Sequence, residues 1–190
     1  MSSIDVNRLD TVSRANLLRV ARESIVHGLR CGRPLDIDAD SSAPALYLPR
    51  ASFVTLELDG ELRGCIGTLE AHRPLLEDVA VNAFNAAFRD PRFPPVRADE
   101  VPRLDIHISV LSPPTSMAFN DEADLLAQLH PGADGLVLSA PGHRATFLPS
   151  VWESLPRPEE FLRQLKRKAG LPADYWSPHI AVERYTTETF

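Results

Sequence analysis

Hydrophobic residues recur at helical spacing near the start of the chain and at alternating positions soon afterwards. Over residues 13–31 the apolar side chains fall on one face of a helix, and Gly32 stands where that helix would end. Residues 52–58 then alternate, Asp59-Gly60 is a favoured two-residue turn, and residues 61–67 return. The pattern therefore predicts a helix followed by a β-hairpin.

The rest of the chain continues with alternating and helical segments. A helix opens after Pro74 and must stop near Asp90, because Pro91 disfavours helical geometry in the residue before it. We expect strands over residues 104–112 and 180–186 and a second hairpin over residues 135–149. Helices are expected over residues 121–129 and 158–168. Because the hairpin turns are short, we predict an α+β fold with a largely antiparallel sheet packed against helices.

Length and composition restrict the class of protein further. The 190 residues, 44% of them hydrophobic, suffice for one large domain or two intimately packed halves with a real core. No apolar run reaches the ~18 residues of a membrane span, and the polar N-terminus lacks a signal peptide's apolar stretch, so we expect a cytoplasmic protein with no membrane contact. The net charge of −6 argues against a nucleic-acid partner.

The segment Leu62 to Thr68 contains the side chains with the clearest potential for chemical reactivity. Strand alternation places Arg63 and Cys65 on the same face, roughly 7 Å apart, where a guanidinium would favour the reactive thiolate. Thr68 supplies a nearby hydroxyl. The alternative is that Cys65 is a small buried residue in a tight hairpin, since free cysteine is among the most buried residue types.

The other residues of this segment indicate an open groove. Leu62 and Ile66 would share the core-facing side, opposite Arg63. Gly64 and Gly67 are poor strand residues and indicate a bulge or a close approach by another backbone or a ligand. A buried guanidinium must be paired, so Arg63 must reach water, a bound anion or a carboxylate, and the candidate carboxylates are Asp90 and Glu153.

Other polar residues could surround the same place. Asp90 is expected to accept hydrogen bonds from backbone amides or from Arg92 as a structural clasp, although Arg92 could instead reach a ligand. His107, mid-strand on the polar face, is interpreted as structural or solvated rather than catalytic. No cysteine or histidine spacing indicates a metal site, and no phosphate loop or cofactor motif is present, so no metal or cofactor is expected. The basic residues at the C-terminal end of the predicted helix 158–168 are interpreted as favourably placed against the negative end of the helix dipole.

The segment Leu62 to Thr68 resembles the signature of the AMMECR domain family. Further segments resemble other motifs of that family, over residues 88–95, 108–114, 145–153, 161–162, 168–171 and 184–186. The resemblance covers residues 13–190, with residues 1–12 as an N-terminal extension of a single domain spanning 1–190. It implies two interlocked subdomains of mixed helix and sheet that enclose a groove lined by the signature.

The resemblance also implies partners and functions. Members in bacteria and archaea often accompany, or are fused to, a Memo-type protein, together with a radical-SAM protein. This chain resembles the stand-alone protein A of that AmmeMemoRadiSam system. The activity of the family is not established; catalysis and a role touching nucleic acid have both been proposed. This chain has His107 where bacterial relatives tend to carry an acidic residue.

Two main hypotheses follow. In the first, the chain is an enzyme or enzyme component acting on a small molecule or a modified residue, with Cys65 as nucleophile or ligand contact and Arg63 as its activator and anion clamp. Thr68 would assist, and the surrounding ligand contacts would be Gly64, Gly67, Asp90, Arg92, His107 and Glu153. In the second, it is a non-catalytic binding or scaffold protein for the Memo-like and radical-SAM partners. A nucleic-acid-associated role is third.

Overall fold

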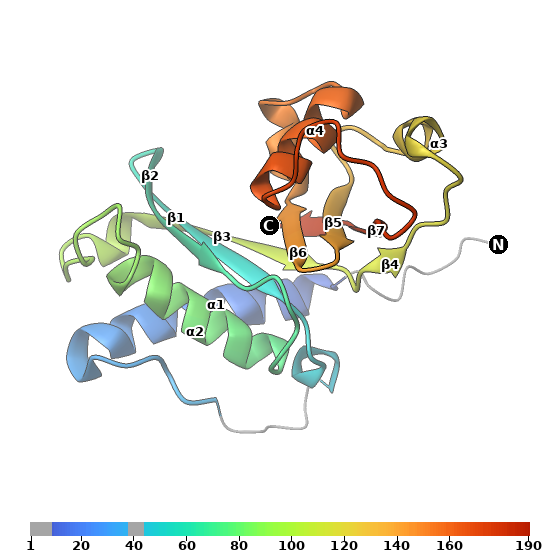
Figure 1. Cartoon of the computed structure of the whole chain (residues 1–190). Coiled ribbons are helices and arrows are strands. Elements are labelled where there is room, and N and C mark those ends of the chain that lie inside the picture. Colours follow the sequence, from blue (N-terminus) through green and yellow to red (C-terminus); the bar gives the residue numbers. More distant parts are fainter. Residues whose placement is uncertain (1–8, 38–43) are drawn as a thin grey trace. The chain divides into compact units, whose positions relative to one another are not determined.

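A computed structural model describes residues 9–37 and 44–190, which form two compact units. The first contains the described residues up to Leu111 together with Glu188–Phe190, and the second contains Ser112–Thr187. Each unit combines a four-stranded sheet with helices (Figure 1), as the α+β prediction requires. No helix in the described ranges is both long and apolar enough to cross a membrane.

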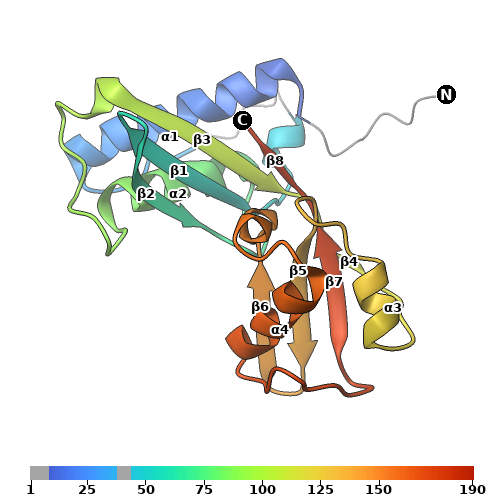
Figure 2. The ribbon, with the colours of Figure 1, turned by 90° about the horizontal axis from the view of Figure 1, so that it is seen from above.

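In the first unit, two helices cover one face of the sheet. The helices are α1 (Thr11–Cys31) and α2 (Leu75–Phe88), and the sheet has the order β2-β1-β3-β8 (Figure 2). The strands are β1 (Ser52–Leu58), β2 (Glu61–Gly67), β3 (Leu104–Leu111) and β8 (Thr187–Thr189), and short 3₁₀ turns lie at Pro44–Tyr47 and Val101–Arg103. Buried aliphatic residues of both helices and of β1 and β3 form one core between helices and sheet.

Local signals position these elements as the sequence predicts. Asp10 caps α1 by accepting a hydrogen bond from the amide of Ser13, and Gly32 ends the helix with a left-handed φ of 68°. The turn between β1 and β2 has positive φ at both Asp59 and Gly60, which matches the right-handed twist of the flanking strands. The first helix and the first hairpin are thereby confirmed.

One irregularity in β2 changes which side chains share a face. Gly64 pairs with Leu56 while Leu62 pairs with Glu57, so Arg63 is an extra residue in a β-bulge. The bulge interrupts the alternation, and Leu62 is 44% exposed rather than part of the core. The expectation that Leu62 and Ile66 share the core-facing side is therefore wrong; only Ile66 packs on the core.

The second unit has a sheet of its own in the order β4-β7-β5-β6. Its strands are β4 (Thr115–Ser116), β5 (Gly135–Ala140), β6 (His143–Phe147) and β7 (Ala181–Tyr185). Its helices are α3 (Glu122–Ala127), α4 (Pro158–Lys168) and a 3₁₀ turn at Pro149–Glu153. Trp152 stacks on Phe161 at a centroid distance of 3.8 Å within its core. The strand predicted over residues 180–186 is confirmed as β7, and the chain then continues into β8 of the other sheet, a short strand that the sequence pattern did not predict.

Candidate functional site

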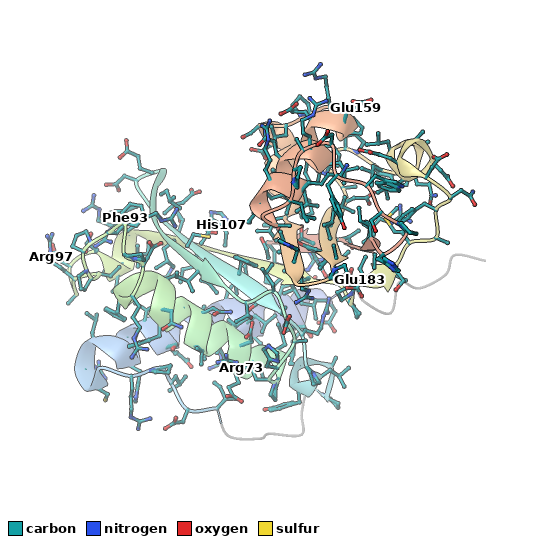
Figure 3. All side chains as sticks on the ribbon, viewed as in Figure 1. Arg73, Phe93, Arg97, His107, Glu159 and Glu183 are labelled. Atoms are coloured by element: carbon teal, nitrogen blue, oxygen red, sulfur yellow. The ribbon has the colours of Figure 1, made fainter. Side chains whose placement is uncertain are left out.

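A row of three polar side chains crosses the sheet of the first unit on the face opposite its helices. Register pairs Thr55 of β1 with Cys65 of β2 on one side and with His107 of β3 on the other. The hydroxyl of Thr55 donates a hydrogen bond to the sulfur of Cys65 at 3.2 Å. His107 is exposed on this face (Figure 3), and its Nε2 lies 3.7 Å from a carboxylate oxygen of Glu57.

The spacing of this row determines what its members can do. Adjacent strands lie about 4.8 Å apart, so the thiol of Cys65 and the ring of His107, two strands apart, are separated by roughly 10 Å. That distance is too long for direct proton transfer, but a ligand lying along the row could contact both. Cys65 is half-buried and hydrogen-bonded to a hydroxyl, so it is not the fully enclosed core cysteine of the alternative interpretation.

The backbone of Cys65 is held by an acid–base pair that occupies the free edge of β2. The carboxylate of Asp90 accepts a hydrogen bond from the amide of Cys65 at 2.9 Å, and Arg92 donates to the carbonyl of Cys65 at 3.3 Å. Asp90 also accepts hydrogen bonds from the backbone and guanidinium of Arg92. The pair makes the two bonds that a neighbouring strand would make, and so protects the sheet edge. The clasp predicted for Asp90 is confirmed.

The hydrogen bonds of the clasp perturb the ionisation of the buried carboxyl. The guanidinium of Arg92, helped by the amide of Cys65, holds the pKa of Asp90 well below its usual range despite burial. A depressed pKa in the folded state means that the carboxylate stabilises the protein above about pH 4, and that this contribution is lost as the pH falls further.

We expect Asp90→Ala to lower the melting temperature at pH 7 by roughly 3–10 °C, because a hydrogen-bonded loop anchor contributes about 1–3 kcal/mol. The deficit relative to the unmodified chain should shrink as the pH is lowered from 5 to 3. Calorimetry across that range checks both statements. Asp105→Ala, which removes an exposed carboxylate from β3 in the same unit, serves as the control. A deficit that stays constant with pH would contradict the assignment.

Arg63 has a partner other than those expected. Its guanidinium makes two hydrogen bonds to the carboxylate of Glu100, at 2.9 and 3.1 Å, and donates to the carbonyls of Pro94 and Pro95. The Arg63 side chain is only 11% exposed, and its contact holds the pKa of Glu100 below its usual range. Arg63 thus binds the 94–100 loop to the bulge, and the guanidinium that donates a hydrogen bond to Cys65 is that of Arg92.

The two glycines of the signature are required by close approaches. A Cβ on Gly64 would overlap the backbone carbonyl oxygen of Ala86, so α2 packs against β2 at contact distance there. A Cβ on Gly67 would overlap the ring of Phe53, which pairs with Gly67 across the strands. The expectation of a bulge or close approach near these glycines is confirmed, and the approaching groups belong to the protein itself.

Thr68 belongs to a buried polar cluster centred on Asp78. Its hydroxyl donates to both carboxylate oxygens of Asp78 at 2.8 Å. Asp78 also accepts hydrogen bonds from Ser52 and Asn82 and lies 3.4 Å from Nε of Arg73. Thr68 therefore ties the end of β2 to α2.

Glu153 lies in the second unit, in the exposed part of a 3₁₀ turn, and is not the carboxylate that pairs with Arg63. Sequence reasoning missed Thr55, Glu100 and Asp78. The hairpin turn alone would pair Thr55 with Gly64, and the bulge at Arg63 shifts that partner to Cys65, so no local signal gave the pairing of Thr55 with Cys65. The described residues contain no cluster of three or more His, Cys, Asp or Glu able to hold a metal ion.

Comparison with known proteins identifies the class of protein. The chain matches the AMMECR1 family over residues 18–190, and it belongs to this family. A protein of Methanothermobacter thermautotrophicus is 37% identical over 181 residues, covering 92% of this chain and 91% of the relative. A protein of Thermotoga maritima is 38% identical over 158 residues, covering 81% and 86%. The crystal structure of an uncharacterised protein from Pyrococcus horikoshii superimposes with a TM-score of 0.77 at 34% identity, covering 91% of this chain and 88% of that one.

Proposed function

We propose that this AMMECR1-family protein is an enzyme or enzyme component that acts on a small polar molecule or a modified residue bound along the row Cys65–Thr55–His107. The observation that carries the proposal is the hydrogen bond from the Thr55 hydroxyl to the Cys65 sulfur on the sheet face away from the helices. A donor aimed at sulfur stabilises the negative charge of a thiolate, the nucleophilic form.

The residues of the row have separate roles in this proposal. Cys65 attacks an electrophilic carbon of the ligand, whose leaving group departs with the bonding electron pair. His107, at the other end of the row and beside Glu57, exchanges a proton with the distant part of the ligand. The Asp90–Arg92 clasp fixes the backbone of Cys65 and so positions its sulfur.

Selective alkylation tests the nucleophile. In a Cys31→Ser background, Cys65 is the remaining cysteine, and we expect iodoacetamide to label it in the folded protein. Thr55→Val should slow that labelling at pH 7 by roughly three- to tenfold, the equivalent of losing one ordinary hydrogen bond of about 1 kcal/mol. Rates followed by intact-mass spectrometry provide the measurement.

The matched control is Ser109→Ala, because Ser109 lies on the same sheet face but its hydroxyl bonds to Thr189 instead. Its labelling rate should stay within about twofold of the background, as for other changes that touch no charged partner. Labelling that requires denaturant, or that is unaffected by Thr55→Val, would remove Cys65 from the role of nucleophile.

A second function is favoured by a different observation. Arg63, Arg92 and Thr68 each bind groups of the chain itself, which leaves little of the signature's charge for a ligand. A non-catalytic protein that binds the Memo-type and radical-SAM proteins would not need free charged groups in the signature. Affinity capture from native extract discriminates the enzyme from the binding protein; recovery of the chain alone at physiological concentration would contradict the binding function.

The net charge of −6 disfavours a nucleic-acid role.

A further inference from the structure

The outer edge of the second sheet presents an unpaired peptide group at Ser116. In the antiparallel pairing of β4 with β7, Met117 donates to the carbonyl of Val182, and Ser116 lies opposite Glu183. Bonds of an antiparallel ladder alternate, so the N–H and C=O of Ser116 point away from β7. Ser116 is exposed, and no described residue bonds to that peptide group.

A pocket of about 450 Å³ opens beside this edge, a size in the range of natural ligand sites. Its walls come from the segment after β4 and from the segment leading into β7, and include Met117, Phe119, Trp176, Ile180 and Val182. None of the described residues that line it is charged. Such a lining favours an uncharged aromatic or aliphatic group over an ion.

The aromatic wall of the pocket is held in place from behind. Phe119 and Trp176 contact each other in a tilted arrangement with centroids 5.7 Å apart. Nζ of Lys166 lies 5.5 Å from the centre of the Trp176 ring and 2.7 Å from the carboxylate of Glu122. Lys166, which the sequence places in the basic end of a helix, is in fact fully buried, so this ion pair fixes α3, α4 and the Trp176 ring together. A wall fixed in this way lowers the entropy cost of binding.

From these observations we infer that β4 and the adjacent pocket bind an extended peptide. The peptide extends the sheet by exchanging two backbone hydrogen bonds with Ser116, and inserts one uncharged aromatic or aliphatic side chain into the pocket, against the wall formed by Phe119 and Trp176. Main-chain bonds supply affinity in this mode and the side-chain pocket supplies selectivity. A small aromatic molecule would fill the pocket but would leave the peptide group of Ser116 unused.

Three probes separate these occupants. The first is the blocked pentapeptide acetyl-Gly-Val-Trp-Val-Gly-amide, the second is the same peptide N-methylated at its three central residues, and the third is free indole. Binding to the full-length, nitrogen-15-labelled protein is followed by amide chemical shifts. We expect saturable binding of the first peptide with a Kd below about 1 mM, and a downfield shift of the Ser116 amide as its hydrogen bond forms.

Variants test the two parts of the site. Phe119→Ala should weaken binding of the first peptide roughly tenfold by removing an aromatic contact, and Leu48→Ala, at an exposed apolar residue of the first unit, should not change it. The N-methylated peptide should bind at least about fivefold more weakly, since its three central residues can no longer donate to Ser116. No saturable shift at 1 mM peptide overturns the inference. Equal binding of the N-methylated peptide, or the same shifts with indole alone, also overturns it and assigns the pocket to a small aromatic molecule.

Discussion

Gly64→Ala is expected to destabilise the protein by about 3 kcal/mol or more, at the upper end of overpacking effects. The added methyl group would overlap the backbone carbonyl oxygen of Ala86. A side chain can rotate away from such an overlap, but a carbonyl within α2 can move only if the helix moves. The helix cannot shift freely, because buried residues such as Val79 and Ala83 fix it against the core.

Urea unfolding followed by far-ultraviolet circular dichroism measures this loss as a lower midpoint. Gly67→Ala is the matched comparison on the same strand, since its methyl group would meet the ring of Phe53, a half-buried side chain that can change rotamer. Its cost should be about 1 kcal/mol. If Gly64→Ala were as stable as the unmodified chain, α2 could not approach β2 as closely as described.

Much of the fold could be predicted because its signals are local. The helix over residues 11–31 and the hairpin at Asp59-Gly60 follow from spacing and turn chemistry that a few neighbouring residues decide. Gly64, a poor strand residue, indicated a bulge in this segment. The position of the bulge at Arg63 depends on how β1 pairs with β2. That shift leaves Leu62 outside the core and makes Arg63 the extra residue of the bulge.

The candidate site could be predicted only in part, because its contacts join distant segments. Cys65 was singled out, but its row with His107 depends on β1 pairing with β3 across an intervening helix. The partner of Arg63 was sought at Asp90 and Glu153, whereas the structure brings Glu100 to it from a loop with no periodicity. No pattern within a short window encodes which carboxylate a guanidinium will meet.

The short last strand, β8, was missed for the same reason. Residues 181–185 pair with β5, yet Phe190 exchanges two backbone hydrogen bonds with Ile108 of the other sheet. The predicted strand ends at Thr186, and the three residues of β8 are too few to show an alternation of their own. Only the positions of the two sheets' remaining strands decide where the chain changes from one to the other.

Asp78→Ala is expected to cost about 3–5 kcal/mol, the loss typical of removing one partner from a buried charged network. Asp78 is 1% exposed and accepts hydrogen bonds from the amide and hydroxyl of Ser52 at 2.9 and 2.7 Å. It also accepts from the Thr68 hydroxyl and the Asn82 amide. Without the carboxylate, these donors stay buried without a full set of acceptors. Glu77→Ala, one residue earlier on α2 but exposed, should change stability by less than about 0.5 kcal/mol.

A double-mutant cycle then decides the role of Thr68. Thr68→Val should cost about 1–2 kcal/mol alone but much less in the Asp78→Ala background, because its acceptor is already gone. Urea unfolding of the four proteins gives the coupling energy. Thr68→Val should also leave the alkylation rate of Cys65 within about twofold of the background, as expected for a residue that acts on stability alone. Additive costs, or labelling slowed as much as by Thr55→Val, would instead place the Thr68 hydroxyl in the chemistry of the thiol.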